Sequence, residues 1–563
     1  MIIGIDLGTT NSLVSIWRDG ASHVIPNKLG LALTPSVVGL DDQGQIVIGQ
    51  AAKERLLTHP LLTASVFKRY MGSNKSINLG SEHFTPQELS AFVVKSLKAD
   101  AEEFLGHEVT EAVITVPAYF NDTQRKFTKM VGELAGLKVE RILNEPTGAA
   151  LAYGLHEKED IQFLVFDLGG GTFDVSVLEL FDDIMEVRAS AGDNQLGGEE
   201  FSSVIIDLFI KNLTVSETEK LSLREKYLHR LNAEAERAKL ALSRDLEYVM
   251  NIDLDDFQHT LVLSRDDFEK ACQPLLKRLQ LPVKQALRDS NIKPAELDAV
   301  ILVGGATRMP MISKLVTTMF GRFPEKKLDP DQVVAMGAAV QAALKSRDQA
   351  LNEMVLTDIC PYTLGIAVAS ETMNGQYRSG VFSPIIERNT TVPVSKQDRF
   401  YSIYENQDVI NVRVYQGESR EVSDNIFLGL IEVKVKPAPA GDAAVDVRFS
   451  YDINGLLEVE TSVVGTDDTE TLIIADKSHH LSKDDIKASL EKLNQLKIHP
   501  RENTENITLI HRGKRLYESN LSDRREIIGQ LLDNFMVVLD TQDEHEIRKA
   551  RKDFSEQLNQ FEY

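Results

Sequence analysis

Two segments of the chain combine glycine, threonine and aspartate in a way that could bind phosphate. Each consists of an apolar run, an Asp-Leu-Gly unit and small or hydroxyl residues, and they extend from Ile3 to Thr10 and from Val165 to Thr172. Glycines allow a backbone to approach phosphate closely, and consecutive amides in a tight turn form an anion-binding nest. Two such turns facing each other across a cleft would hold a triphosphate from both sides. The sequence therefore predicts a phosphate site built from a duplicated strand–turn–strand.

The aspartates of these two segments, Asp6 and Asp167, could also place a cation beside the phosphates. Carboxylate oxygens are hard ligands that suit Mg²⁺, here through bound water. The chain contains no Gly-x-x-x-x-Gly-Lys-[Ser/Thr] segment, so a P-loop is not predicted. One glycine-rich turn alone is more often a plain hairpin. The matched pair, about one domain length apart, is what favours phosphate binding.

Three blocks of different periodicity must position these residues. Residues 1–350 alternate short apolar runs with helical patterns such as Glu88–Phe104, which predicts an α/β domain. Residues 360–480 alternate apolar and polar side chains with period two, which predicts an antiparallel β-sandwich. Residues 481–563 have a helical period that Pro500 interrupts. Residues 351–359 link the first two blocks and are apolar at their centre, so we expect this linker to dock.

The charge balance and the cysteine content exclude several classes of protein. The 563 residues include 62 Lys and Arg against 85 Asp and Glu, and the net charge of −23 argues against nucleic acid as the main partner. We find no apolar run long enough to span a membrane and no features of a secretory signal. The two cysteines, Cys272 and Cys360, lie far apart and exclude a disulfide scaffold. We therefore expect a cytoplasmic protein without nucleic-acid or membrane partners.

Several segments also resemble a known family, the DnaK-type heat-shock chaperones or heat shock protein 70 family. Ile3–Leu13, Val165–Val177 and Ile301–Pro310 are similar to its three signature segments, and the resemblance extends over essentially the whole chain. It implies an actin/hexokinase-like ATPase domain of the duplicated ribonuclease H-like type, a peptide-binding β-sandwich and a short α-helical lid. The implied function is that of an ATP-dependent chaperone, which binds extended hydrophobic segments of unfolded proteins and hydrolyses ATP to ADP and phosphate.

The resemblance assigns the residues of the ATPase site. Lys68 would position the attacking water, although the sequence around it is equally that of a surface lysine, and Thr9 and Thr172 would contact the γ-phosphate. The carboxylates that would order water and bind Mg²⁺, with K⁺ beside it, are Asp6, Glu145, Asp167 and Asp174. The other nucleotide contacts are Gly8, Thr10, Asn11, Gly169, Gly170, Gly171, Gly197, Gly198, Glu199, Glu236, Lys239, Ser243, Gly304, Gly305, Arg308 and Asp331. Without the family, the helical stripe containing Lys239 would be read as a solvated charged face.

The resemblance also assigns coupling and peptide-binding positions. Pro117 and Arg125 match residues that connect the nucleotide state to the substrate domain, although a proline there can simply end a strand. Positions that match contacts to a J-domain co-chaperone are Arg141, Asn144 and Asp358. Positions that match the peptide cleft are Met373, Ile403, Ile410 and Val412. Apolar residues at strand spacing are more often core residues, so the cleft role depends on the resemblance.

Three segments are shorter than in the housekeeping members of the family. They are Met71–Phe84, Tyr248–Leu263 and the C-terminal block. The second argues against recognition by a GrpE-like exchange factor, and the third argues against a full lid. Together with Thr357, which replaces the usual leucine in the linker, these features resemble the HscC-like bacterial branch.

Two other functions would use the same kind of cleft. A sugar or small-molecule kinase explains the phosphate turns but explains neither the β-rich and helical blocks nor the apolar linker. A filament-forming cytoskeletal ATPase is disfavoured by the same appended blocks.

Overall fold

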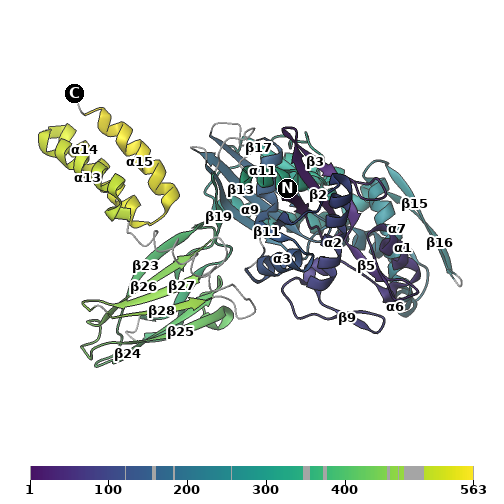
Figure 1. Cartoon of the computed structure of the whole chain (residues 1–563), viewed down its shortest axis with the longest axis horizontal. Coiled ribbons are helices and arrows are strands. Elements are labelled where there is room, and N and C mark those ends of the chain that lie inside the picture. The colour runs from purple at the N-terminus through teal and green to yellow at the C-terminus, as the bar shows by residue number, and fades with distance from the viewer. Residues whose placement is uncertain are drawn as a thin grey trace. The chain divides into compact units, whose positions relative to one another are not determined.

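The computed structural model consists of two compact units, Met1–Leu356 and Thr357–Tyr563. The first mixes strands and helices, and the second contains strands followed by helices (Figure 1). The residues that the structure describes are 2–118, 120, 122–154, 160–181, 184–254, 257–346, 355–371, 377–452, 457–466, 468–474, 500–520 and 522–561.

The first sheet of the N-terminal unit contains the first glycine-rich turn. β1 (Ile2–Asp6) pairs antiparallel with β2 (Asn11–Arg18) and parallel with β10 (Glu111–Val116). β11 (Lys138–Asn144) and β3 (Ala21–Ile25) complete the strand order β11-β10-β1-β2-β3. The turn therefore lies where β1 ends, and it is followed at once by the antiparallel return strand.

The second sheet repeats this arrangement around the second turn. β12 (Ile161–Leu168) pairs antiparallel with β13 (Phe173–Phe181) and parallel with β17 (Ala299–Val303). β14 (Ile184–Asp193) and β18 (Val355–Leu356) complete the order β17-β12-β13-β14-β18. Each sheet thus contains a hairpin whose first strand has a parallel neighbour, as a duplicated strand–turn–strand requires.

The apolar linker contributes the edge strand of the second sheet. In β18, Val355 and Leu356 pair in parallel with Ile184 and Met185 of β14. The expected docking of the linker is therefore present as backbone pairing inside the first unit.

Two helices cross closely on the first sheet. α11 (Val333–Lys345) packs on β1, β2 and α4 (Glu145–Ala152). A Cβ on Gly337 would collide with the carbonyl oxygen of Gly148, so the helices can approach this closely only because position 337 is glycine. The crossing holds Glu145, the first residue of α4, against the sheet.

The remaining elements of the first unit surround these two sheets. The predicted helix at Glu88–Phe104 is α2 (Pro86–Leu105), which begins with a capping box between Thr85 and Glu88. The other helices are α1 (Gln50–Thr58), α3 (Asp122–Leu134), α5 (Gly198–Asn212), α6 (Glu217–Lys226), α7 (Leu228–Leu242), α8 (Arg265–Ala271), α9 (Gln273–Asp289) and α10 (Pro310–Phe320), with 3-10 turns η1 (Pro60–Leu62), η2 (Phe67–Tyr70) and η4 (Gly305–Arg308). The minor strands are β4 (Thr34–Pro35), β5 (Val37–Leu40), β6 (Ile46–Ile48), β7 (Thr63–Ser65), β8 (Ile77–Leu79), β9 (Glu82–Phe84), β15 (Glu247–Leu254) and β16 (Phe257–Ser264).

The second unit begins with a β-sandwich. Its two four-stranded sheets have the orders β21-β20-β24-β25 and β23-β26-β27-β28, and their inward side chains, such as Val414 and Phe449, share one core. The elements are β19 (Asp358–Ile359), β20 (Leu364–Glu371), β21 (Tyr377–Ile386), β22 (Thr391–Val392), β23 (Val394–Tyr401), β24 (Val409–Gln416), η5 (Val422–Asp424), β25 (Ile426–Lys434), β26 (Ala444–Tyr451), β27 (Leu457–Val463) and β28 (Thr469–Ile474). The period-two pattern therefore predicted the right kind of structure here.

Helices follow the sandwich, as the sequence predicted. η6 (Pro500–Glu502) leads into α13 (Thr504–Ser519), α14 (Ser522–Asp540) and α15 (Glu544–Asn559), which pack as a small bundle (Figure 1). Phe535 and Phe554 stack in its core with their ring centroids 4.7 Å apart. The stretch of the predicted helical block before Pro500 lies outside the described residues.

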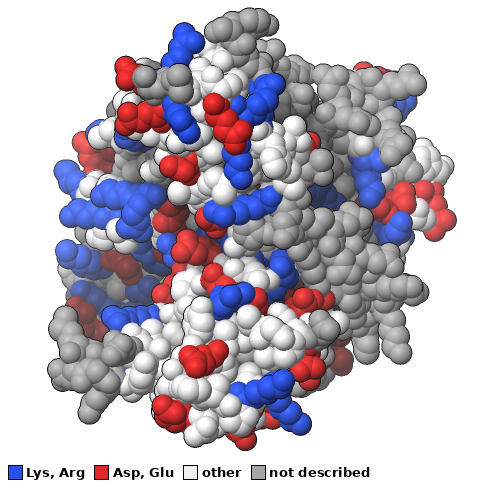
Figure 2. All heavy atoms as spheres, turned by 90° about the vertical axis from the view of Figure 1, so that its left-hand side faces the viewer, with Lys and Arg blue, Asp and Glu red and all other residues white. Residues whose placement is uncertain are grey.

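Two observations concern the described helices and the charges on one face of the molecule. Among the described helices, none has the length and apolar character needed to cross a membrane. Acidic side chains lie among the basic ones on the face shown in Figure 2. That mixture is expected of an ordinary charged surface.

Candidate nucleotide-binding cleft

One cavity in the first unit brings the two glycine-rich turns together. It encloses about 580 Å³, part of which is open to solvent. The predicted site residues in its lining are Asp6, Gly8, Thr9, Thr10, Asn11, Lys68, Glu145, Asp167, Gly169, Gly170, Thr172, Gly304, Gly305 and Asp331. Leu13, Leu33, Val303, Pro330 and Val334 complete the lining, and the sequence offered no signal that separates them from ordinary core residues.

Glycine allows the two turns to touch. A Cβ on Gly170 would collide with the side chain of Thr10, and one on Gly171 would stand 2.8 Å from the methyl carbon of Thr9. On the first turn, the Gly8 amide donates to Ser12 Oγ at 3.2 Å, which holds the backbone of the turn in place. The turns thus face one pocket, as the interpretation of the sequence requires.

A buried ion pair lies at the cavity. Lys68, in η2, is only 3% exposed, and its Nζ donates to Glu145 Oε1 at 3.1 Å. The ring of Phe120 lies below the same ammonium group, 5.4 Å from Nζ to the ring centroid. Since an unpaired buried charge is costly, this pairing shows why two residues far apart in sequence are held together.

The aspartates around this pair carry more negative charge than the lysine balances. Burial, followed by the charge of Glu145, raises the pKa of Asp6 to about 7. Burial, then Glu145 and Asp174, raises the pKa of Asp167 well above its usual range. Asp174 is the cross-strand partner of Asp167 and is also buried. A cation placed here would relieve the repulsion, so the cluster is suited to attract one.

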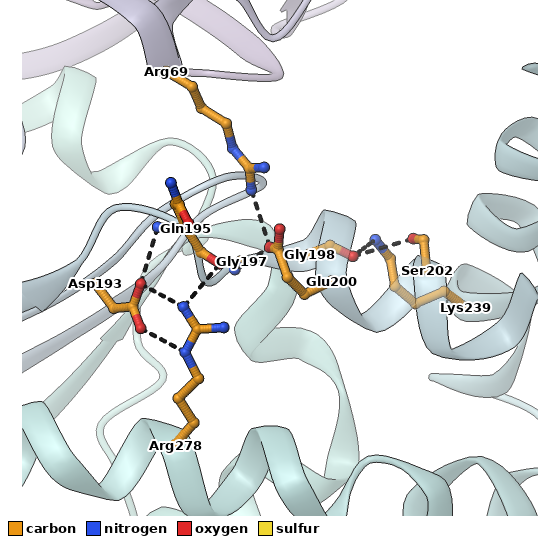
Figure 3. A network of polar contacts seen from close by, with 9 residues as sticks. All are labelled: Arg69, Asp193, Gln195, Gly197, Gly198, Glu200, Ser202, Lys239 and Arg278. Carbon is orange, nitrogen blue, oxygen red and sulfur yellow. Dashed lines mark hydrogen bonds and ion pairs between the residues drawn. The ribbon is translucent and has the colours of Figure 1, made fainter. Parts of the chain in front are cut away.

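A second group of predicted residues surrounds the start of α5, beside the second turn (Figure 3). The buried Lys239, on α7, donates from Nζ to the Gly198 carbonyl at 2.9 Å and pairs with Glu236 Oε2 at 2.6 Å. Ser243 is the C-cap of α7, and Glu199 is an exposed residue in the first turn of α5. Lys239 is therefore not part of a solvated face.

The same region contains charged residues that the sequence did not single out. Arg278, on α9, binds both carboxylate oxygens of Asp193, at 2.7 and 2.8 Å, and also donates to the Gln195 carbonyl (Figure 3). Arg69 pairs with Glu200 at 3.0 Å. Both arginines therefore bind residues of the segment 193–200, which leads into α5. Neither pair has a spacing in sequence that would have revealed it.

Asp331 lines the cavity, and Arg308, which does not line it, pairs with Asp331. Arg308, in η4, donates from Nε and Nη2 to Asp331 Oδ2 at 2.9 and 2.8 Å. Gly304 has φ of +81°, and a Cβ there would collide with the Leu168 carbonyl, so only glycine fits beside the second sheet.

The predicted coupling residues lie in different surroundings. Arg125, on α3, donates to the carbonyls of Ala118 and Phe120, at 3.1 and 3.0 Å, and so supports the loop that begins at the buried Pro117. The two positions matched to J-domain contacts in the first unit are Arg141 within β11 and Asn144 at its end. Asp358 belongs to the second unit, where its backbone pairs with Val392.

The predicted peptide-binding residues differ in burial and location. Ile410 and Val412, on β24, are 9% and 2% exposed and belong to the sandwich core. Ile403 is half-buried in the loop between β23 and β24, where its amide donates to Gln407 Oε1 at 3.0 Å. Met373 lies outside the described residues.

Comparison with known proteins gives the family. A model of the family described as Hsp70 protein matches residues 2–79 and 75–562. The chain belongs to the Hsp70 family. A "Chaperone protein DnaK" of Thermosipho africanus is 42% identical over 501 residues, which cover 87% of this chain and 82% of the relative. Another, from Thermotoga neapolitana, is 39% identical over 537 residues, which cover 93% and 88% of the two chains.

Membership in the Hsp70 family also gives the activity. The protein is an ATP-dependent molecular chaperone and hydrolyses ATP. The kinase and the cytoskeletal filament considered from the sequence are therefore set aside. The two matched pieces of the family model overlap at residues 75–79, inside the segment Met71–Phe84.

Proposed function

We propose that the cavity is the ATPase site of this Hsp70 and that its predicted residues have the roles assigned from the sequence. The observation that carries the proposal is the convergence of both Asp-Leu-Gly turns and the Lys68–Glu145 pair on one pocket. In this site Thr9 and Thr172 contact the γ-phosphate, and Lys68 positions the attacking water. Catalysis is then mainly positioning and charge neutralisation.

The carboxylates fit a water-mediated Mg²⁺, with K⁺ beside it. Their raised pKa values mean that the ionised carboxylates are disfavoured there, and a balancing cation would favour their ionisation. Among the residues that the structure describes, no three His, Cys, Asp or Glu side chains converge closely enough to ligate a metal directly. Asp6, Glu145 and Asp167 would therefore hold the ion through water, and the ion would neutralise charge on the phosphates.

We further propose a function for each part of the chain. Residues 1–350 form the ATPase domain, residues 351–359 the linker, residues 360–480 the peptide-binding domain and residues 481–563 the lid. The backbone pairing of β18 with β14 supports a linker whose docking depends on nucleotide. Pro117 and Arg125 transmit the nucleotide state, and the peptide lies in a groove formed by Met373, Ile403, Ile410 and Val412. The clients are extended apolar segments of unfolded proteins.

Partners and subfamily follow from the same resemblance. A J-domain co-chaperone would engage Arg141, Asn144 and Asp358. The β15–β16 hairpin has only eight residues in each strand, which supports the expectation that a GrpE-like factor does not recognise it. The relatives above are named DnaK, so the HscC-like branch is proposed on the shortened segments alone.

Single-turnover hydrolysis tests the site. We expect Lys68→Ala and Asp167→Ala each to lower the rate by about 100-fold or more, because each removes a charge aimed at the phosphates or the attacking water. The control is Lys53→Ala, an exposed lysine on α1, which should hydrolyse ATP at the wild-type rate. Wild-type rates in both cleft variants would overturn the assignment.

A further inference from the structure

A charged contact joins the segment that carries Lys68 to the far side of the cavity. Arg69, the neighbour of Lys68 in η2, extends to Glu200 on α5, with 3.0 Å between Nη2 and Oε2 (Figure 3). The two side chains are only 18% and 24% exposed, so water screens the pair less than it screens a surface pair. η2 packs on α2, whereas α5 packs with α7 beside the second sheet. The contact therefore connects the surroundings of the two turns.

Glu200 is also part of the structure that holds the second turn. Its Oε2 accepts the Gly197 amide at 2.7 Å at the start of α5. One residue further on, the amides of Gly198 and Glu199 donate to the carbonyls of Gly169 and Gly170, both at 2.9 Å. Glu200 is thus connected to the glycines of the second phosphate turn by hydrogen bonds at the start of α5.

Arg69 itself lies against that turn. A Cβ on Gly171 would stand 2.5 Å from Arg69 Nε, so the guanidinium can cross there only because the residue is glycine. Nε is buried and has no hydrogen-bond partner among the described residues. The arginine is therefore fixed by one strong contact, the carboxylate of Glu200.

The backbone before Arg69 is strained. Val66 precedes η2 with φ of +51°, a left-handed conformation that β-branched residues rarely adopt. Such a conformation is unfavourable and persists only where its surroundings hold it. Two ion pairs help to hold this segment, Lys68 with Glu145 and Arg69 with Glu200, and the neighbouring Phe67 is buried in the core.

We propose that Arg69 is a positioning residue for ATP hydrolysis. Its ion pair with Glu200 connects η2 to the α5 segment that holds the second phosphate turn. This connection keeps the Lys68 ammonium at the cavity. It also slows the dissociation of the nucleotide. The inference rests on the ATPase site proposed above, and it adds a contact that closes the site without touching the reacting atoms.

The test is a double-mutant cycle with Arg69→Met and Glu200→Gln. The amide of Gln can still accept the Gly197 amide, so the start of α5 keeps its cap while the charge is lost. We expect each single variant to release a fluorescent ADP analogue about 5- to 10-fold faster and to hydrolyse ATP more slowly in single turnover. The double variant should be no worse than either single variant, because both remove the same interaction.

The controls separate this inference from a general loss of stability and from failure of the ATPase site. Arg224→Met removes the Arg224–Asp207 pair on the outer side of α5 and should leave the release rate unchanged. Arg69→Lys keeps the charge and should recover part of the slow release, and thermal unfolding checks that each variant is folded. The inference is wrong if wild-type protein binds the analogue but the two substitutions increase its release rate additively in the double variant. It is also wrong if Arg224→Met increases the release rate as much as Arg69→Met does. If wild-type protein does not bind the analogue, the site itself is wrong.

Discussion

The buried charges around the cavity show two behaviours, since some are paired and others have shifted pKa values. Lys68 and Glu145 show the first case, with 3.1 Å between their charged atoms. Asp6 and Asp167 show the second, because burial and neighbouring carboxylates disfavour their ionised forms. The difference matters for function, since a paired charge is already satisfied whereas a shifted carboxylate gains from a cation.

The effect of burial on a carboxyl pKa can be tested separately at a carboxylate outside the cleft. Asp100, on α2, is 6% exposed, and burial raises its pKa, although the charge of Lys28 opposes the shift. A raised pKa means that the folded state holds the proton more tightly than the unfolded state. The contribution to stability is therefore complete below the unfolded pKa and is lost as the pH rises through the folded pKa.

We expect Asp100→Asn to stabilise the protein at pH 7, within about 1 kcal/mol, and to have little effect near pH 4. The amide keeps an oxygen acceptor but cannot ionise, so it avoids the cost that the carboxylate meets at neutral pH. Urea unfolding of both proteins at the two pH values measures the difference. A gain that is equal at both pH values, or larger in acid, would contradict this account.

Among the elements, β18 is one of the shortest strands, and it has a clear functional meaning. β18 contains only Val355 and Leu356, yet it extends the second sheet by pairing with β14. A free edge strand presents unpaired backbone groups, and an apolar linker can satisfy them without losing its ability to detach.

Replacing both Val355 and Leu356 by proline should prevent this pairing. Successive amides of a strand point in opposite directions, so one of the two faces β14, and proline has no amide hydrogen to donate. Hydrogen exchange at the start of β14 should become faster in this variant. The double alanine variant keeps both amides and should exchange at close to the wild-type rate. Equal protection in the proline and alanine variants would show that the strand does not form in solution.

For the whole molecule, the proposed chaperone cycle requires peptide affinity to depend on the bound nucleotide. Coupling between two sites is a free energy, commonly about 1–3 kcal/mol, and it must pass through residues that differ between the two states. Arg125 is a candidate because it supports the loop after Pro117 through two carbonyl contacts.

We expect ATP to weaken the binding of a labelled apolar peptide to the wild-type chain by about 5- to 150-fold relative to ADP. In Arg125→Met this ratio should fall towards one while ATP binding persists, because the variant loses the two contacts to the loop. Fluorescence anisotropy of the peptide in each nucleotide measures the ratio, with Lys53→Ala as the control. Equal peptide affinity with ATP and ADP in the wild-type protein would overturn the coupling mechanism, even if the ATPase were active.

The sequence by itself was sufficient for the features that depend on local pattern. The period of apolar residues predicted α2, the strands of the sandwich and the terminal helices, because burial of one face imposes that period. The two Asp-Leu-Gly turns were recognisable because glycine is needed wherever backbone must come close to other groups, as Gly170 does to Thr10.

Only the tertiary structure decided which distant charges meet. Lys68 and Glu145 are 77 positions apart, and Arg69 and Glu200 are 131 positions apart, so no local period relates them. Their contacts arise from the way the two sheets, α4 and α5 are brought around the cavity. The location of a charged side chain depends on where its backbone lies, and packing over the whole unit determines where the backbone lies.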